Sequence, residues 1–132
     1  MTEKKQLTRE AELRFAAELT RRGWIIYFPY NDETPIDLLA WKDGEYLRIQ
    51  VKATRQKNGA ITCRLKSSNN WQVKKYTKRE VDCFAIYDYE NKKGYLIPIE
   101  KVQGLTEPLL RCVKAKNNQE KGIRHADEFL YF

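Results

Sequence analysis

The sequence is poor in the residues that build disulfide frameworks, histidine metal sites and membrane spans. Its three cysteines, Cys63, Cys83 and Cys112, are odd in number and far apart, so they predict neither a disulfide framework nor a zinc site. The single histidine, His125, is interpreted as a surface or packing residue. No run approaches the roughly 18 apolar residues of a membrane span, and the opening MTEKKQLTRE lacks the apolar stretch of a signal peptide. We therefore expect a protein of the reducing cytoplasm with no membrane partner.

The chain does contain enough apolar residues for one modest core, together with an excess of positive charge. Of its 132 residues, 42% are hydrophobic and 12% are aromatic, which predicts a single domain over residues 1–132. The net charge is +7 and the pI is near 9.3, which favours an anionic partner. Charge alone identifies neither a sequence preference nor a catalytic activity.

The pattern of apolar residues and turn signals predicts an α+β domain. An amphipathic helix is expected over residues 7–23, with Thr8 as its cap and Gly23 at its end. Strands are expected at 24–28, 36–41, 45–54, 60–65, 81–89 and 94–99, with two-residue turns at 43–44 and 58–59. Segments 66–80 and 114–122 are polar and basic without sustained periodicity, and a further helix is expected near 99–104 or at the C-terminus. These elements predict a mainly antiparallel sheet flanked by helices.

The turn at 43–44 predicts how its two flanking strands pair, because a two-residue loop fixes the register. When the residues beside the turn face each other, Asp37 faces Gln50, and Lys52 follows on the same face. The opposite face is then continuously apolar, with Ile36, Leu38, Ala40, Leu47, Ile49, Val51 and Ala53. The polar face is either a chemical site or the solvated side of an ordinary hairpin.

A carboxylate, an amide oxygen and a lysine on one patch suit the hydrolysis of a phosphodiester. Asp37 and Gln50 offer the hard oxygen ligands that Mg²⁺ takes, and Lys52 suits a phosphate or an attacking water. Glu12 shares a helical stripe with Phe15 and other apolar residues, so its carboxylate points inward and needs a partner. That partner is a metal or Lys52, or else Glu12 pairs with a neighbouring lysine.

These residues resemble the PD-(D/E)XK nuclease superfamily, and most closely its intron-encoded homing endonucleases and its Holliday-junction-resolvase-like members. The likeness lies in TPID followed by a hairpin and QVK, with a helical glutamate upstream. Three further blocks, RGWIIYFPYNDETPIDLL, YTKREVDCFAIYD and GYLIPIE, are similar as well, so residues 10–100 are covered. The resemblance implies a restriction-endonuclease-like core.

The resemblance also implies roles for individual residues. Asp37 and Gln50 would bind a divalent metal, Mg²⁺ or Mn²⁺, with the carbonyl of Val51 as a further ligand, while Lys52 would position or activate water. Glu12 matches the helical glutamate of resolvase-like members. Ile36 stands where a proline usually precedes the aspartate, which concerns the geometry of the strand start. Gln50 replaces the usual acid, which removes one negative charge and weakens metal binding unless Glu12 compensates.

Basic and polar residues beside this patch suggest contact with double-stranded DNA, because lysine and arginine neutralise phosphates. The basic candidates are Arg55, Lys57, Arg64, Lys66, Lys74, Lys75, Lys78 and Arg79. A basic hairpin over residues 53–66 suits a major groove, with hydrogen bonds to base edges from Gln56, Asn58, Thr62 and Arg64. The same residues would equally serve as the solvated surface of a small charged protein.

The expected activity is metal-dependent, site-specific cleavage of duplex DNA of the homing-endonuclease type. Two other readings stay open: a structure-selective junction resolvase, and a catalytically inactive DNA-binding module of the same fold. Cleavage of both strands needs two sites, so a homodimer or homotetramer is expected.

Overall fold

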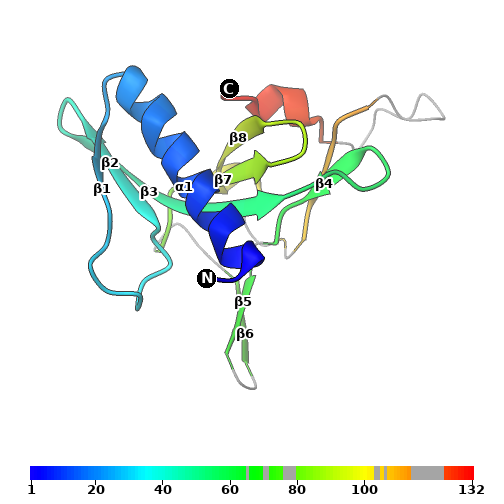
Figure 1. Ribbon diagram of the computed structural model, residues 1–132, viewed down its shortest axis with the longest axis horizontal. Helices are drawn as coiled ribbons and strands as arrows, with labels where there is room; N and C mark the ends of the chain where they lie inside the picture. Colours follow the sequence, from blue (N-terminus) through cyan, green and yellow to red (C-terminus); the bar gives the residue numbers. More distant parts are fainter. Residues whose placement is uncertain (65, 70–71, 76–79, 103–104, 106, 114–123) are drawn as a thin grey trace.

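The computed structural model describes residues 1–64, 66–69, 72–75, 80–102, 105, 107–113 and 124–132, with the backbone alone for 66–69 and 72–75. One long helix, α1 (Glu3–Arg21), lies across a five-stranded sheet (Figure 1). No helix in the described ranges is long and apolar enough to cross a membrane.

Helix α1 begins earlier than the sequence predicts. Thr2 caps it, and its hydroxyl accepts a hydrogen bond from the Lys5 amide at 3.2 Å. The predicted cap, Thr8, is therefore wrong: it lies inside the helix and donates to the carbonyl of Lys4 at 3.0 Å. The polar residues before Thr8 are good helix formers, so the helix extends to the first residue that can cap it. Gly23, with φ of +95°, follows the helix as predicted.

The five-stranded sheet has the order β1-β2-β3-β7-β8. Its strands are β1 (Ile25–Tyr27), β2 (Leu38–Lys42), β3 (Glu45–Thr54), β7 (Cys83–Asp88) and β8 (Lys93–Pro98). Three of its four pairings are antiparallel and β3 pairs with β7 in parallel, so the sheet is mixed, in agreement with the predicted α+β class. The parallel pair joins the strand of Gln50 and Lys52 to the buried centre of the sheet.

Smaller elements lie outside this sheet. They are β4 (Ala60–Thr62) paired with β9 (Leu109–Arg111), β5 (Lys66–Asn69) paired with β6 (Gln72–Lys75), and the 3-10 helices η1 (Ile99–Lys101) and η2 (Ala126–Phe129). Segment 66–80 contains β5 and β6, which its sequence did not predict because it lacks sustained periodicity, and segment 114–122 lies outside the described residues. The turn at 58–59 forms as predicted, but β4 then pairs with β9 instead of continuing a hairpin on β3. The further helix expected near 99–104 or at the C-terminus takes the form of the short η1 and η2.

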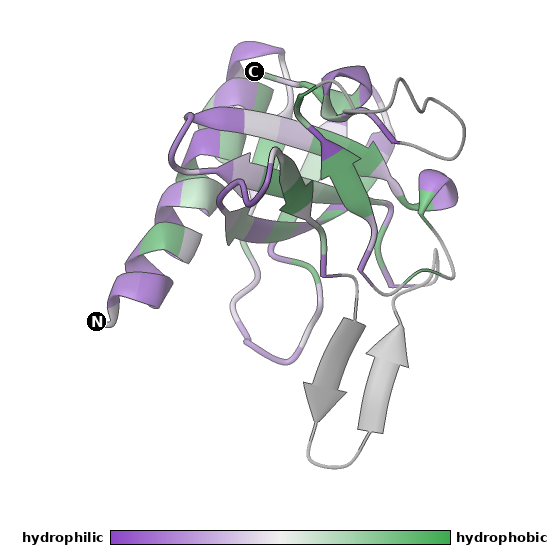
Figure 2. Cartoon of the chain, turned by 90° about the vertical axis from the view of Figure 1, so that its right-hand side faces the viewer, coloured by the Kyte–Doolittle hydropathy of each residue, from purple (hydrophilic) through white to green (hydrophobic). Residues whose placement is uncertain are grey.

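Both faces of the sheet carry apolar side chains, and these define two cores. Hydrophobic and hydrophilic residues alternate along helix α1 (Figure 2). The core under α1 consists of Ala11, Phe15, Leu19, Leu38, Ala40, Ile49, Val51, Cys83, Ala85 and Tyr87. On the other face, β4, β9, η1 and η2 cover β7 and β8. The predicted apolar face of the first hairpin is confirmed, because its central members lie in the core under α1.

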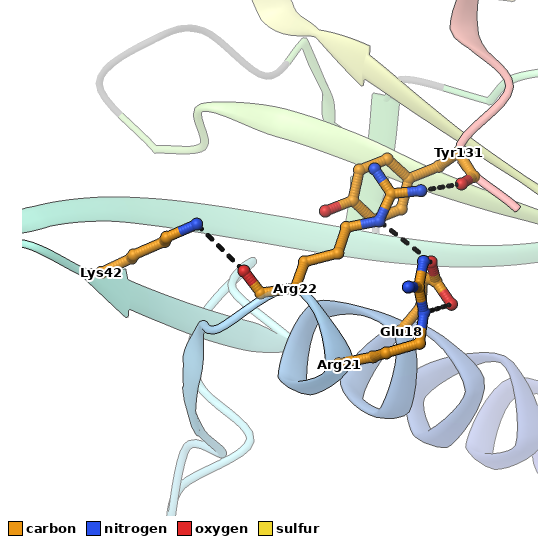
Figure 3. Close-up of polar contacts among 5 residues, drawn as sticks. All are labelled: Glu18, Arg21, Arg22, Lys42 and Tyr131. Carbon is orange, nitrogen blue, oxygen red and sulfur yellow. Dashed lines mark hydrogen bonds and ion pairs between the residues drawn. The ribbon is translucent and has the colours of Figure 1, made fainter.

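The C-terminal end of α1 is tied to the rest of the fold by polar contacts (Figure 3). Arg22 donates to Glu18 at 2.9 Å and to the carbonyl of Tyr131, and its guanidinium stacks 3.7 Å from the centre of the Tyr131 ring. Lys42 of β2 donates to the carbonyl of Arg22 at 2.9 Å. These contacts fix the orientation of the helix that carries Glu12.

Asp82 joins the start of β7 to β3. Its carboxylate accepts from the Arg48 amide at 2.8 Å and from the Arg48 guanidinium at 3.0 and 3.1 Å, while its own amide donates to the Arg48 carbonyl at 2.8 Å. These contacts give Asp82 a structural role at the start of β7. The two residues align the parallel pair of strands.

We expect Asp82→Asn to lower the free energy of unfolding by about 1–3 kcal/mol, because it removes a charged acceptor from half-buried donors. Urea unfolding followed by circular dichroism measures this change, with the exposed Glu33→Gln as a charge-matched control. An Asp82→Asn protein as stable as the control would contradict the role given to this pair.

Candidate functional site

Asp37 lies immediately before β2, where its side chain reaches β3. Its Oδ2 accepts a hydrogen bond from the Val51 amide at 2.8 Å and from Nε2 of Gln50 at 3.1 Å, and its amide donates to the Ile49 carbonyl at 2.8 Å. The observed register of β2 and β3 is the predicted one along the whole ladder. The structure therefore brings Asp37 and Gln50 together, as the turn at 43–44 predicts.

Glu12 and Asp37 line the same small cavity, of about 110 Å³. The other lining residues are Arg9, Phe28, Pro29, Asn31, Asp32, Thr34 and Ile36. Glu12 is 8% exposed, on the buried side of α1. Its pKa is raised, first by burial and then by the negative charge of Asp37, while Arg9 acts in the opposite direction. The two carboxylates are therefore close enough to repel each other, although they come from different elements.

Lys52 completes the predicted cluster from β3. Burial lowers its pKa, and the charge of Asp37 opposes that change, whereas Arg64 and Lys4 lower it further. Burial raises the pKa of Asp37, and the hydrogen bonds from Val51 and Gln50 and the charge of Lys52 oppose the rise. Each group thus affects the protonation of another, as expected when a carboxylate and a lysine share one site.

In the described part of the chain, the side-chain amide of Gln50 has a hydrogen-bond partner for its nitrogen but none for its oxygen. Its Nε2 donates to Asp37, but its Oε1 is buried and has no hydrogen-bond partner among the described residues. A buried acceptor without a donor is costly unless a ligand supplies the missing contact. Gln50 is 8% exposed, so this oxygen points into the protein beside a carboxylate.

This donor set fits a hard divalent cation that keeps part of its water shell. Asp37 and Glu12 offer carboxylate oxygens, Gln50 offers an unused amide oxygen, and the carbonyl of Val51 is the fourth predicted ligand. Within the described ranges, no group of three or more His, Cys, Asp or Glu side chains could hold a metal. The fit therefore depends on the neutral oxygen of Gln50 as well as on the two carboxylates.

The residues predicted to contact DNA differ in their exposure to solvent, and some lie outside the described residues. Lys57, Asn58, Thr62 and Arg64 are exposed on the turn at 58–59 and beyond it. Arg55 is exposed and lies 3.8 Å from Glu90, whereas Gln56 is half-buried and its amide donates to the buried Asp88 at 3.2 Å. The backbones of Lys66, Lys74 and Lys75 belong to β5 and β6, and Lys78 and Arg79 lie outside the described residues.

Arg9 is a residue of the site that the sequence analysis missed. Its Nη1 lies 3.3 Å from Oε2 of Glu12, and its side chain lines the cavity that Glu12 and Asp37 share. The sequence does contain a sign of this contact. Arg9 and Glu12 are three residues apart, and residues three apart on a helix lie side by side.

A known protein family matches nearly the whole chain. The family model for PD-(D/E)XK endonucleases matches residues 2–132. This chain belongs to the PD-(D/E)XK endonuclease family. The predicted resemblance is thereby confirmed, and the family makes the chain a nuclease that acts on DNA. PD-(D/E)XK enzymes generally depend on a divalent metal.

Among solved structures, the PD-(D/E)XK chain is similar to one described as a bacterial homing endonuclease, I-Ssp6803I, with a TM-score of 0.77. The match covers 98% of this chain and 89% of the other at 18% sequence identity, so it shows the fold, which confirms the predicted restriction-endonuclease-like core. No curated protein matches the chain.

Proposed function

We propose that this PD-(D/E)XK enzyme is a Mg²⁺- or Mn²⁺-dependent, site-specific endonuclease of the homing type that hydrolyses phosphodiester bonds in double-stranded DNA. The observation that carries the proposal is the buried Oε1 of Gln50, which lies beside the carboxylate of Asp37 and has no hydrogen-bond donor in the described part of the chain. The proposal is further supported by the half-buried Lys52 in the same cluster and by the fold that the chain shares with a homing endonuclease.

In this mechanism Glu12, Asp37, Gln50 and the carbonyl of Val51 would hold the metal. A bound divalent cation would supply positive charge to the phosphate and to the leaving oxygen. Lys52 orients the attacking water and takes part in removing its proton, which its lowered pKa favours. The exposed basic residues around the turn at 58–59 hold the phosphates on either side.

We propose further that the enzyme acts as a homodimer or a homotetramer, because one chain carries one site and duplex cleavage needs two. An apolar surface supports contact between copies: Ile25, Tyr27 and Tyr46 are 50%, 51% and 60% exposed on the side of the sheet away from α1. Ile25 and Tyr46 both neighbour Trp41, so they belong to one patch. Light scattering after size-exclusion chromatography measures the assembly.

The activity is tested by incubating the protein with a linear duplex library and with four-way junctions of varied sequence, in Mg²⁺ and in EDTA. We expect Mg²⁺-dependent cleavage of duplexes that carry one particular sequence. Lys52→Met should reduce cleavage by about 10³-fold, since it removes the ammonium group and keeps the length of the side chain. Lys93→Met, at an exposed lysine that begins β8, is the matched control.

The same experiment separates the alternatives. Cleavage of four-way junctions of any sequence, with linear duplexes left intact, would replace the homing activity with that of a junction resolvase. Tight DNA binding without cleavage of any substrate would leave a catalytically inactive module.

A further inference from the structure

Arg9 lies at the edge of the site and forms an ion pair with Glu12 that a bound metal would disturb. Its guanidinium contacts Oε2 of Glu12 at 3.3 Å, one helical turn away. The side chain of Arg9 is 67% exposed, whereas that of Glu12 is 10% exposed. Arg9 thus reaches from solvent to a carboxylate that lines the cavity with Asp37.

Arg9 offsets the repulsion between the two carboxylates of the site. Its guanidinium contacts Glu12 and its side chain lines the cavity that Glu12 and Asp37 share, so its positive charge lies beside both carboxylates. The guanidinium also occupies an oxygen of Glu12 that would bind a divalent cation. A cation and Arg9 therefore compete for Glu12, because both bring positive charge to the same atom.

Arg9 can exchange its contact with Glu12 for a contact with a phosphate at a small cost in free energy. The pair is half-buried, with an exposed Arg9 and a buried Glu12 three residues apart on one helix, so the guanidinium can leave Glu12 from its solvent side when a cation takes its place. A guanidinium presents five donors in a planar fork that matches the oxygens of a phosphate. The Arg9 side chain is exposed and lines the cavity with Glu12 and Asp37, so a phosphate held at those carboxylates by a metal would lie within its reach.

On the basis of the proposed function, we propose that Arg9 is an exchangeable phosphate ligand of the nuclease site. It holds Glu12 in the metal-free protein, and it binds a phosphate oxygen of DNA after Glu12 has become a metal ligand. Arg9 thereby couples metal binding at Glu12 to binding of the DNA backbone.

The exchange predicts opposite effects of Arg9→Gln on two measurements. Calorimetric titration of Mn²⁺ into the DNA-free protein should show binding tighter by about two- to five-fold, because the competitor for Glu12 is gone. DNA affinity, measured in a Lys52→Met background to prevent cleavage, should fall by about ten-fold in Mg²⁺ and change little in EDTA. Arg9→Lys should restore part of the affinity in Mg²⁺, since it keeps the charge and loses the fork.

Arg21→Gln is the matched control. Arg21 is also 67% exposed and pairs with a glutamate three residues away on the same helix, but it lies at the far end from the site. It should leave both measurements unchanged. Unchanged or weaker Mn²⁺ binding in Arg9→Gln, or an equal loss of DNA affinity in Mg²⁺ and EDTA, would overturn the exchange. Failure of the wild-type protein to bind Mn²⁺ and to cleave DNA would instead overturn the proposed function itself.

Discussion

Replacing Asp37 with asparagine should lower the single-turnover rate of DNA cleavage by roughly three orders of magnitude or more, with the protein still folded. Asparagine keeps one oxygen that can accept from the Val51 amide, so the start of β2 should hold its position. It loses the negative charge that a divalent cation needs, and it adds an amide donor beside the Gln50 amide, which is also a donor. Calorimetry should show the loss of Mn²⁺ binding.

Asp43→Asn provides the control for this substitution. Asp43 has φ of +49° in the turn between β2 and β3, a conformation that asparagine also adopts readily. The control therefore makes the same chemical change on the same hairpin, away from the site, and should leave cleavage unaffected. If Asp37→Asn cleaved DNA within ten-fold of the wild-type rate, Asp37 would not be a metal ligand.

The position of the site could be predicted from the sequence because two local patterns determine it. The turn at 43–44 needs two residues with positive φ, and Asp43 and Gly44 have φ of +49° and +82°. That turn sets the register which places Asp37 against Gln50. The helical period likewise predicts the direction of the Glu12 side chain. The spacing of Glu12 to Phe15 places both on the buried side of α1.

What could not be predicted depends on contacts between distant parts of the chain. Strand β4 pairs with β9, far along the sequence, so no local pattern distinguishes this arrangement from a hairpin on β3. The parallel pairing of β3 with β7 is non-local as well. Within the site, the sequence raised the question of a neutral Gln50. It could not reveal that Nε2 donates to Asp37 while Oε1 has no donor among the residues that the structure describes.

Gln50 also explains how the site tolerates Glu12. A third carboxylate would add to the repulsion that already raises the pKa of Glu12 and would make the metal-free protein less stable. An amide at this position supplies an oxygen without a charge and donates a hydrogen bond that favours the ionised form of Asp37. If Gln50 binds the metal as proposed, glutamine in place of an acid weakens the attraction for the metal and makes the metal-free protein more stable.

Glu12→Gln should reduce cleavage by about 10²-fold or more and at the same time make the metal-free protein more stable at neutral pH. Burial and Asp37 raise the pKa of Glu12 in the folded state above its ordinary value of 4.5. The folded protein therefore holds this proton more tightly than the unfolded chain does. Stability falls as pH rises from the ordinary pKa through the raised one, and glutamine removes that loss.

Urea unfolding in EDTA at pH 7.5 and at pH 4 tests this prediction. The stability gain of Glu12→Gln should be present at pH 7.5 and should shrink at pH 4, where the glutamate is largely protonated in both states. Glu18→Gln, on the same helix, should act in the opposite direction. Hydrogen bonds from Arg21 and Arg22 lower the pKa of Glu18 to about 2, so its loss should destabilise the protein at pH 7.5 and leave cleavage intact. A Glu12→Gln protein less stable than the wild type at pH 7.5 would mean that the ion pair with Arg9 outweighs burial, and that Glu12 is a structural residue.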